Sequence, residues 1–184
     1  LFRSHNISTF VETGCFRGNA LAVARGLGFK KLHSCDIELA NVVYCKKIFP
    51  EGDIVVEHKP SVEFLEDLLP TLDNNNSIVF FLDAHLPDEI QYHSSNLTQE
   101  EINNNIKSLL PLEHELDIIW KYRSNKKDFI IVDDLRIYED LDFGGGRWDD
   151  RAKYGSPSID FLNKYNYNVE KFLNEEGYLY LTSK

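Results

Sequence analysis

Positively charged residues and long apolar runs are both scarce in this sequence. Its 20 lysines and arginines stand against 30 aspartates and glutamates, giving a net charge of −10. Proteins that bind nucleic acids usually carry a basic face, and no stripe of lysine or arginine is present, so we expect no nucleic-acid partner. No run of about 20 apolar residues occurs, so we expect no transmembrane helix and no membrane partner. The acidic balance suits a small or neutral binding partner instead.

Methionine is absent altogether, including from the first position, and a basic-then-apolar leader is also missing. We therefore expect residues 1–184 to be a single domain of a longer polypeptide, whose other domains are candidate partners. The three cysteines, Cys15, Cys35 and Cys45, are too few and too widely spaced for a disulfide framework or a zinc site. Buried free thiols predict a reducing compartment: the cytoplasm, or the host cytoplasm if the source is viral.

Short apolar runs alternate with helical patterns along most of the chain. The expected strands are 7–13, 32–37, 54–57, 77–82 and 129–132, and the expected helical stretches are 19–25, 41–48, 62–69 and 98–120. This alternation predicts a parallel sheet with helices on both faces. Two further strand-like runs, 167–173 and 178–182, are joined so closely that they must form an antiparallel hairpin. The predicted fold is α/β: a Rossmann-like three-layer sandwich with a mostly parallel seven-stranded sheet and a C-terminal antiparallel hairpin.

A glycine-containing turn with the pattern E-x-G-x-x-x-G follows the first expected strand. Glycines let the chain bend sharply and let a ligand approach the backbone, and the next helix offers free N–H groups. The carboxylate of Glu12 would repel a pyrophosphate but could attract a sulfonium or amino group. We interpret the turn as a cofactor loop, with a generic glycine turn as the alternative. The candidate binding residues are Glu12, Gly14, Cys15, Phe16, Arg17, Gly18 and Asn19.

An acidic residue ends the second expected strand, about 20 residues after the glycine loop, where it can hold the two hydroxyls of a ribose. We assign this role to Asp36, with Ile37 beside it. Glu38 is the alternative if the strand register differs by two residues. Ser61, after the third strand, is a candidate for contact with an adenine edge. Both Asp36 and Ser61 are also ordinary helix-capping residues.

Three carboxylates follow two apolar strands that are expected to be neighbours: Asp83 after one, Asp133 and Asp134 after the other. Ligands of parallel sheets bind beyond the carboxyl ends of the strands, and three carboxylates there would repel one another without a compensating cation. Oxygen ligands favour Mg²⁺ or Mn²⁺. The alternative is that each aspartate caps a turn. Asp83 also follows a strand next to the glycine loop, so we assign it cofactor-binding and catalytic roles as well.

His85 lies two residues after Asp83 and would share its face if the strand continued. A neutral imidazole beside a metal-bound hydroxyl can act as general base. The alternatives are that His85 is another metal ligand or only a polar loop residue. His93 and His114 are weaker candidates.

The segment 135–156 is rich in aromatic and charged residues and contains three consecutive glycines at 144–146. Aromatic rings that stack on sugars, together with hydrogen-bonding charges, would suit a carbohydrate acceptor, and a glycine hinge would suit a lid that excludes water. An ordinary exposed loop is the alternative. The candidate acceptor-binding residues are Arg136, Tyr138, Arg147 and Trp148.

Taken in order, these motifs resemble class I S-adenosylmethionine (SAM)-dependent methyltransferases, and most closely the metal-dependent O-methyltransferases of the catechol and macrocin sugar types. The resemblance runs from Phe10 to Leu181. It implies SAM as cofactor, and it places a proposed base of the sugar-type enzymes at His85. Two departures stand out: many relatives carry an acidic residue where this chain has Pro60, and the segment 87–116 resembles an insertion.

We therefore expect a SAM-dependent, divalent-metal-assisted O-methyltransferase that methylates a sugar hydroxyl, for example on a rhamnose-type residue of a glycan. The alternatives are a metal-independent methyltransferase of small molecules and a non-catalytic Rossmann-like binding module. The absence of G-x-G-x-x-G and the terminal hairpin argue against a nucleotide-linked oxidoreductase.

Overall fold

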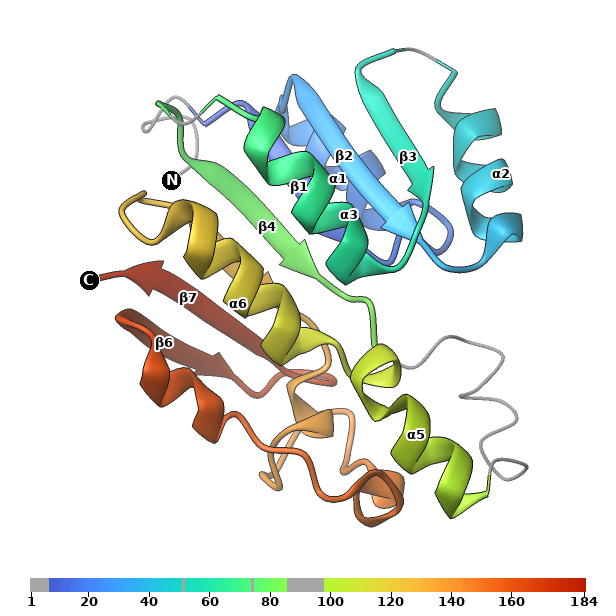
Figure 1. The fold of residues 1–184 in the computed structure, drawn as a ribbon, viewed down its shortest axis with the longest axis vertical. Coiled ribbons are helices and arrows are strands. Elements are labelled where there is room, and N and C mark those ends of the chain that lie inside the picture. The colour runs from blue at the N-terminus through green and yellow to red at the C-terminus, as the bar shows by residue number, and fades with distance from the viewer. Residues whose placement is uncertain (1–6, 51, 74, 86–97) are drawn as a thin grey trace.

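One mixed sheet forms the centre of the protein. The computed structural model describes residues 7–50, 52–73, 75–85 and 98–184. In this part of the chain, the strand order is β3-β2-β1-β4-β5-β7-β6 (Figure 1). The strands are β1 (Thr9–Thr13), β2 (Lys31–Asp36), β3 (Ile54–His58), β4 (Ile78–Leu82), β5 (Phe129–Val132), β6 (Tyr167–Phe172) and β7 (Tyr178–Ser183).

The direction of the strands follows the connections between them. Strands β1 to β5 pair in parallel, each linked to the next by a helical crossover. Strand β7 runs antiparallel to both β5 and β6, because the short connection between the last two strands allows no crossover. The predicted mostly parallel, seven-stranded Rossmann-like sheet with a C-terminal hairpin is confirmed.

Helices cover the sheet on both faces. They are α1 (Asn19–Leu27), α2 (Leu39–Ile48), α3 (Ser61–Leu68), α5 (Gln99–Leu109) and α6 (Leu112–Arg123), with 3₁₀ turns η2 (Leu69–Thr71), η4 (Leu135–Ile137), η5 (Asp149–Tyr154) and η6 (Asp160–Lys164). In Figure 1, α3 and α6 lie in front of the sheet and α1 lies behind it. No helix among the described residues is long and apolar enough to cross a membrane.

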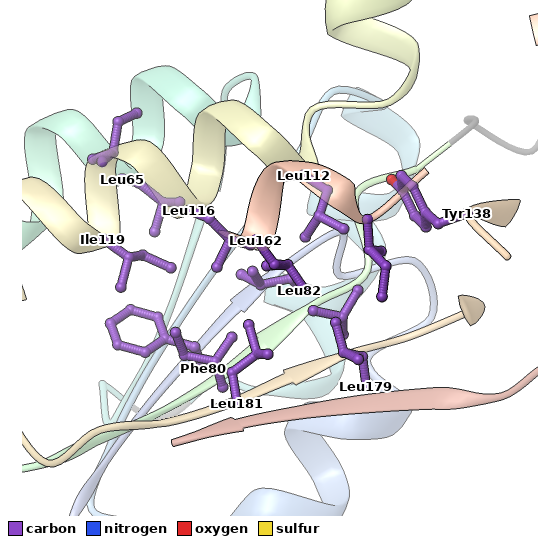
Figure 2. Packing of buried hydrophobic residues seen from close by; sticks show 14 of the residues in the cluster. Leu65, Phe80, Leu82, Leu112, Leu116, Ile119, Tyr138, Leu162, Leu179 and Leu181 are labelled. Atoms are coloured by element: carbon purple, nitrogen blue, oxygen red, sulfur yellow. The ribbon is translucent and has the colours of Figure 1, made fainter. Parts of the chain in front are cut away.

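Alternating side chains of the strands build a separate core on each face. On β4, Phe80 and Leu82 point to the side of α6, where they meet Leu116 (Figure 2), while Val79 points to the side of α1 and packs with Leu21. A central strand that is covered on both faces is apolar at successive positions, which explains the continuous apolar run in β4.

The amphipathic stretch expected at 98–120 is two helices instead of one. Thr98 caps the start of α5 in a capping box with Glu101, and α5 ends just before Pro111, which cannot continue a helix because it lacks an N–H donor. Helix α6 then places Leu112 and Leu116 in the core. That the segment 87–116 is an insertion stays a prediction; its first part, residues 86–97 with His93, lies outside the described residues.

A buried ion pair joins the end of α6 to β4 and β5. The Arg123 guanidinium donates through Nε and Nη2 to the Asp128 carboxylate, at 2.5 and 2.8 Å, and Asp128 accepts from the backbone N–H of Ile78 at 2.8 Å. The side chain of Arg123 is fully buried and that of Asp128 is 5% exposed. The ion pair holds the C-terminal end of α6, and the N-terminal end of the same helix lies beside His85. The pair therefore helps to fix the position of the N-terminal end of α6.

We expect Asp128→Ala to lower the free energy of unfolding by about 3–5 kcal/mol, because it leaves a buried guanidinium without its counter-charge. Urea unfolding followed by circular dichroism measures this change. Lys164→Ala, which removes exposed ion pairs to Glu113 and Asp117, is the matched control and should cost less than about 1 kcal/mol. Equal losses in the two variants would contradict the assignment.

Candidate active site

A pocket of about 410 Å³ opens at the carboxyl ends of β1, β2 and β4. This volume is within the usual range for small-molecule sites. Its position beyond the carboxyl ends of parallel strands is the one that the sequence analysis predicted. The lining residues are Gly14, Phe16, Cys35, Asp36, Ile37, Glu38, Asn41, Lys59, Pro60, Ser61, Val62, Asp83, Ala84, His85, Lys107, Ser108 and Pro111.

The glycine loop forms one wall of this pocket. Gly14 adopts φ +84°, and the N–H groups of Gly14 and Cys15 both donate to the carbonyl of Cys35, at 3.0 and 2.9 Å. A Cβ atom on Gly14 would lie 2.4 Å from the carbonyl oxygen of Asp83. Only glycine tolerates both this φ and this approach, so the loop is pressed against the end of β4.

Asp36 ties the glycine loop to the end of β2. One carboxylate oxygen accepts from the N–H of Glu38 at 2.8 Å, and the other accepts from the N–H of Phe16 at 2.9 Å and the amide of Asn41 at 3.2 Å. Asp36 and its alternative Glu38 both line the pocket. A ribose contact by either residue stays a prediction, and the geometry shows that Asp36 also organises the loop.

Glu12 lies behind the loop and does not line the pocket. Its side chain accepts a hydrogen bond from the Ser34 hydroxyl at 2.5 Å, and the residue is 1% exposed. Burial raises the pKa of its carboxyl to about 8, although the Ser34 hydrogen bond opposes the shift. A pKa of about 8 favours the neutral acid at neutral pH, and a role of Glu12 in cofactor binding stays a prediction.

The other predicted loop residues hold the backbone of the loop. Cys15 is buried, and Gly18, in the left-handed conformation, precedes α1, whose first residue is Asn19. The Arg17 guanidinium lies over the rings of Phe16 and Tyr44, at 5.5 and 5.2 Å from the ring centroids. Among these residues, Phe16 is the one that lines the pocket.

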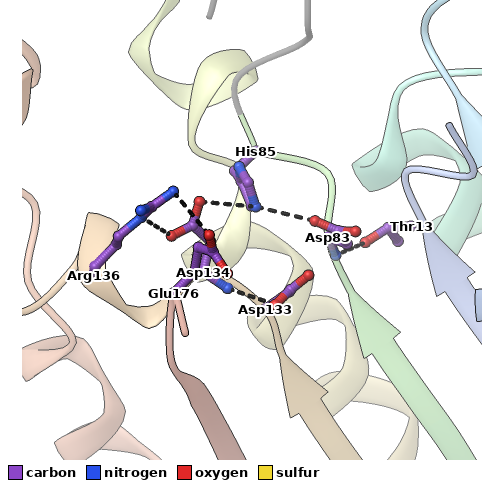
Figure 3. Close-up of polar contacts among 7 residues, drawn as sticks. All are labelled: Thr13, Asp83, His85, Asp133, Asp134, Arg136 and Glu176. Atoms are coloured by element: carbon purple, nitrogen blue, oxygen red, sulfur yellow. Dashed lines mark hydrogen bonds and ion pairs between the residues drawn. The ribbon is translucent and has the colours of Figure 1, made fainter. Parts of the chain in front are cut away.

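The structure brings together the residues predicted at the ends of β4 and β5, as Figure 3 shows. His85 Nε2 lies 3.0 Å from an Asp83 oxygen and 4.0 Å from an Asp134 oxygen. Asp134 also accepts from Arg136 Nε at 2.8 Å, and its N–H donates to Asp133 at 2.9 Å. Three carboxylates and two cationic side chains thus share one small volume.

Burial and mutual repulsion shift the pKa values in this cluster. Burial, reinforced by the charge of Asp83, raises the pKa of Asp133 to about 6, and burial also raises that of Asp134. For His85, burial opposes protonation, but the hydrogen bond and charge of Asp83, with the charges of Asp134 and Asp133, outweigh it and raise the pKa. The neighbouring carboxylates thus favour protonation of His85.

The donor set suits a hard divalent cation, because all three carboxylates supply oxygen. However, no group of three or more side chains among the described residues is already arranged to hold a metal ion. Arg136 engages one oxygen of Asp134, and His85 contacts Asp83. The residues that would hold a metal are thus gathered, while the coordination geometry itself is not formed.

The predicted acceptor-binding residues do not converge on the pocket. Arg136 pairs with Asp134 and lies 3.7 Å from Glu176. Tyr138 is 4% exposed and belongs to the core. Arg147 pairs with Asp140 at 3.5 Å, and Trp148 stacks on Tyr154 with ring centroids 5.2 Å apart. Their role in binding an acceptor stays a prediction.

Helices α5 and α6 contribute residues that the sequence analysis missed. Lys107 and Ser108 line the pocket, and Glu115 is a fully buried acid on α6. A signal was present in the sequence: Glu115 occupies a position of the apolar stripe that includes Leu112, Leu116 and Ile119, where a solvated carboxylate is not expected.

We expect the stability difference between Glu12→Gln and the wild type to depend on pH. The folded state keeps a proton on Glu12 up to a pH of about 8, whereas the unfolded state loses it near the ordinary pKa of 4.5. Wild-type stability should therefore fall relative to Glu12→Gln between these pH values, by at most about 1.4 kcal/mol per pH unit, and level off above them. Unfolding curves from pH 5 to 8 measure it, with the exposed Glu66→Gln as control. Parallel pH profiles for wild type and Glu12→Gln would refute a neutral Glu12.

Comparison with protein-family models and with curated proteins finds no match to this sequence. Solved structures with a similar fold include a candidate caffeoyl-CoA O-methyltransferase from Staphylococcus aureus, with a TM-score of 0.65 and 13% identity over 100% of this chain and 79% of that chain. A candidate O-methyltransferase from Klebsiella pneumoniae has a TM-score of 0.62 and 12% identity over 100% and 76%. An O-methyltransferase from Bacillus cereus, solved with S-adenosylhomocysteine (SAH), has a TM-score of 0.60 and 11% identity over 100% and 77%. The chain therefore has the fold of class I SAM-dependent O-methyltransferases, as its sequence motifs suggested.

Proposed function

We propose that this protein is a SAM-dependent, divalent-metal-assisted O-methyltransferase whose acceptor is a sugar hydroxyl. The observation that carries the proposal is the direct contact between the two parts of the site. The cofactor-sized pocket and the cluster of His85 with its carboxylates share Asp83 and His85 as lining residues. A methyl donor in the pocket and an acceptor at the cluster would therefore be neighbours, as a direct transfer requires.

The pocket offers suitable partners for each part of SAM. Ile37, Pro60 and Val62 supply apolar surface for an adenine ring, and Ser61 lies at the start of α3 beside them. Asp36 or Glu38 would hold the ribose hydroxyls. Gly14 and Phe16 supply the part of the pocket wall that comes from the glycine loop. When bound, SAM supplies an activated methyl group on a sulfonium.

The carboxylate cluster can activate a hydroxyl group. Mg²⁺ or Mn²⁺ held by Asp83, Asp133 and Asp134 would lower the pKa of an acceptor hydroxyl and orient it, and two vicinal hydroxyls would suit such an ion. His85, held beside Asp83, would receive the hydroxyl proton on Nε2. The hydroxyl oxygen would then form the new O–CH₃ bond as the C–S bond of the sulfonium breaks, and SAH would be the leaving group.

The choice of acceptor rests on charge and on resemblance. A neutral polyol can donate hydrogen bonds to carboxylates without adding negative charge, which fits a chain of net charge −10. The similarity of the motifs to the macrocin sugar type points in the same direction, towards a rhamnose-type residue of a glycan. We further propose that the protein acts in the cytoplasm on a small-molecule or glycan acceptor, alone or with other domains of its polypeptide, without a nucleic-acid or membrane partner.

A metal-independent methyltransferase is the second candidate, and one observation favours it. His85 already lies against Asp83, and Arg136 already neutralises Asp134. These two side chains, when protonated, could compensate the carboxylates without a metal ion.

Calorimetric titration with SAH tests the proposed cofactor. We expect the wild type to bind SAH with micromolar affinity, and Gly14→Ala to weaken binding by more than about tenfold, because the added Cβ forces the loop away from Asp83. Gly26→Ala is the matched control, since no atom lies within 4 Å of a Cβ at that position of α1, and its affinity should equal that of the wild type. Absence of SAH binding by the wild type, with and without metal, would disprove the methyltransferase function and favour a non-catalytic binding module.

Titration with Mn²⁺ in the presence of SAH tests the metal. We expect the wild type to bind Mn²⁺ and Asp133→Asn to bind it at least about tenfold more weakly, because the amide removes a charged oxygen ligand. SAH affinity should be unchanged in Asp133→Asn, since Asp133 does not line the SAM-sized pocket. A wild type that binds SAH but no Mn²⁺ at millimolar concentration would leave the metal-independent candidate.

A further inference from the structure

Glu115 is a buried carboxylic acid at the catalytic end of α6. The residue is 1% exposed. The hydroxyls of Ser61 and Thr13 hydrogen-bond to its carboxyl group, and His85 and Tyr138 are close enough for charge interactions with it. Burial raises its pKa to about 7, with those hydrogen bonds and the charge of His85 opposing the shift. Thus one side chain lies between the end of β1, the start of α3 and the residue after β4 that is our proposed base.

Three polar atoms in this region are buried without a hydrogen-bond partner among the described residues: Nδ1 and Nε2 of His85, and Oε1 of Glu115. Nε2 makes an ion-pair contact with Asp83 at 3.0 Å, which leaves Nδ1 and Oε1 to be explained. Each unsatisfied buried polar atom costs roughly 1–3 kcal/mol, so native structures rarely leave two close together. His85 uses its other nitrogen, Nε2, to face the carboxylates.

Both residues line the same small void. It has a volume of about 10 Å³ and is bounded by residues that include His85, Glu115, Pro111 and Tyr138. A void of this size has room for one water molecule at most. One water that accepts from His85 Nδ1–H and donates to Glu115 Oε1 would satisfy both atoms, since ordered buried waters typically link otherwise unpaired groups.

We propose that Glu115 is a positioning residue for His85, which it holds through one water that accepts the Nδ1–H hydrogen bond. Nδ1 is then committed to Glu115, and the ring keeps Nε2 aimed at Asp83 and the acceptor side. Histidines in catalytic sites are commonly oriented in this way, by a partner on the ring nitrogen that does not react. Glu115 itself does not line the SAM-sized pocket.

This arrangement makes α6 part of the catalytic machinery. The helix is held at its C-terminal end by the buried pair Arg123–Asp128, and near its N-terminal end it presents Glu115 to His85 and to Ser61. The catalytic importance of this link rests on the proposed function. The geometric claim, that His85 depends on Glu115 for its orientation, does not.

The test is NMR spectroscopy of the ¹⁵N-labelled full chain at neutral pH. The protein has six histidines, and the signals of His85 are those that disappear in His85→Gln. We expect the wild type to show an Nδ1–H proton on His85 that is protected from exchange with solvent. In Glu115→Leu, which replaces the acid by an apolar side chain, this signal should be lost, because an Nδ1–H without an acceptor is costly in a buried site. Glu115→Gln, whose amide oxygen can still accept, should restore it.

The matched control is Glu113→Leu, an exposed position of the same helix, which should leave the His85 signals unchanged. A wild type without a protected Nδ1–H, or a Glu115→Leu variant that retains it, would overturn the proposal. If Glu115→Leu does not fold, the wild type and Glu115→Gln still decide, because both must show the proton.

SAH titration of the same samples separates this inference from the proposed function. A wild type with the protected Nδ1–H but without SAH affinity would refute the function alone. A wild type that binds SAH but lacks the proton would refute the positioning role alone. Glu115→Leu should bind SAH within about threefold of the wild type, since the residue does not line the pocket; a tenfold loss with an unchanged His85 signal would assign Glu115 to the cofactor site instead.

Discussion

Close packing of the Gly14 backbone against the Asp83 carbonyl is the contact on which the site depends. Because no side chain separates the glycine loop from the end of β4, a cofactor in the pocket would lie directly beside the carboxylate cluster. The carbonyl of Cys35 and the Asp36 carboxylate, both at the end of β2, accept hydrogen bonds from successive N–H groups of the loop. A larger residue at position 14 would move the pocket away from the carboxylate cluster, even if each of the two parts kept its own geometry.

Compensation of negative charge is the second constraint. Three carboxylates meet at the ends of β4 and β5, and burial makes their repulsion costly. Ion pairs with His85 and Arg136 reduce this repulsion in part. The raised pKa values of Asp133 and Asp134, which favour their uncharged forms, reduce it further. A divalent cation would complete the compensation, and this is the physical reason for preferring metal assistance over the metal-independent alternative.

Buried acidic side chains also connect neighbouring secondary-structure elements. Glu12 is neutralised by burial and accepts from Ser34, which joins β1 to β2. Glu115 connects α6 to Thr13 and Ser61, and Asp128 joins α6 to β4 and β5. These contacts place the helices that surround the pocket, so the electrostatics of the interior and the geometry of the site are linked.

The sequence by itself determined the sheet and the position of the site. Apolar strands alternating with helices require a parallel sheet, and a parallel sheet gathers Asp36, Asp83 and Asp133 at one edge because all of these residues follow strand ends. Only the tertiary structure decided how the individual groups behave. It buried Glu12 and thereby raised the pKa of its carboxyl, paired Arg136 with Asp134 and packed Tyr138 in the core. It also brought Glu115, 30 residues away along the chain, to the side of His85. Burial and long-range contact set the charge and orientation of each of these groups, and neither can be read from the local sequence pattern.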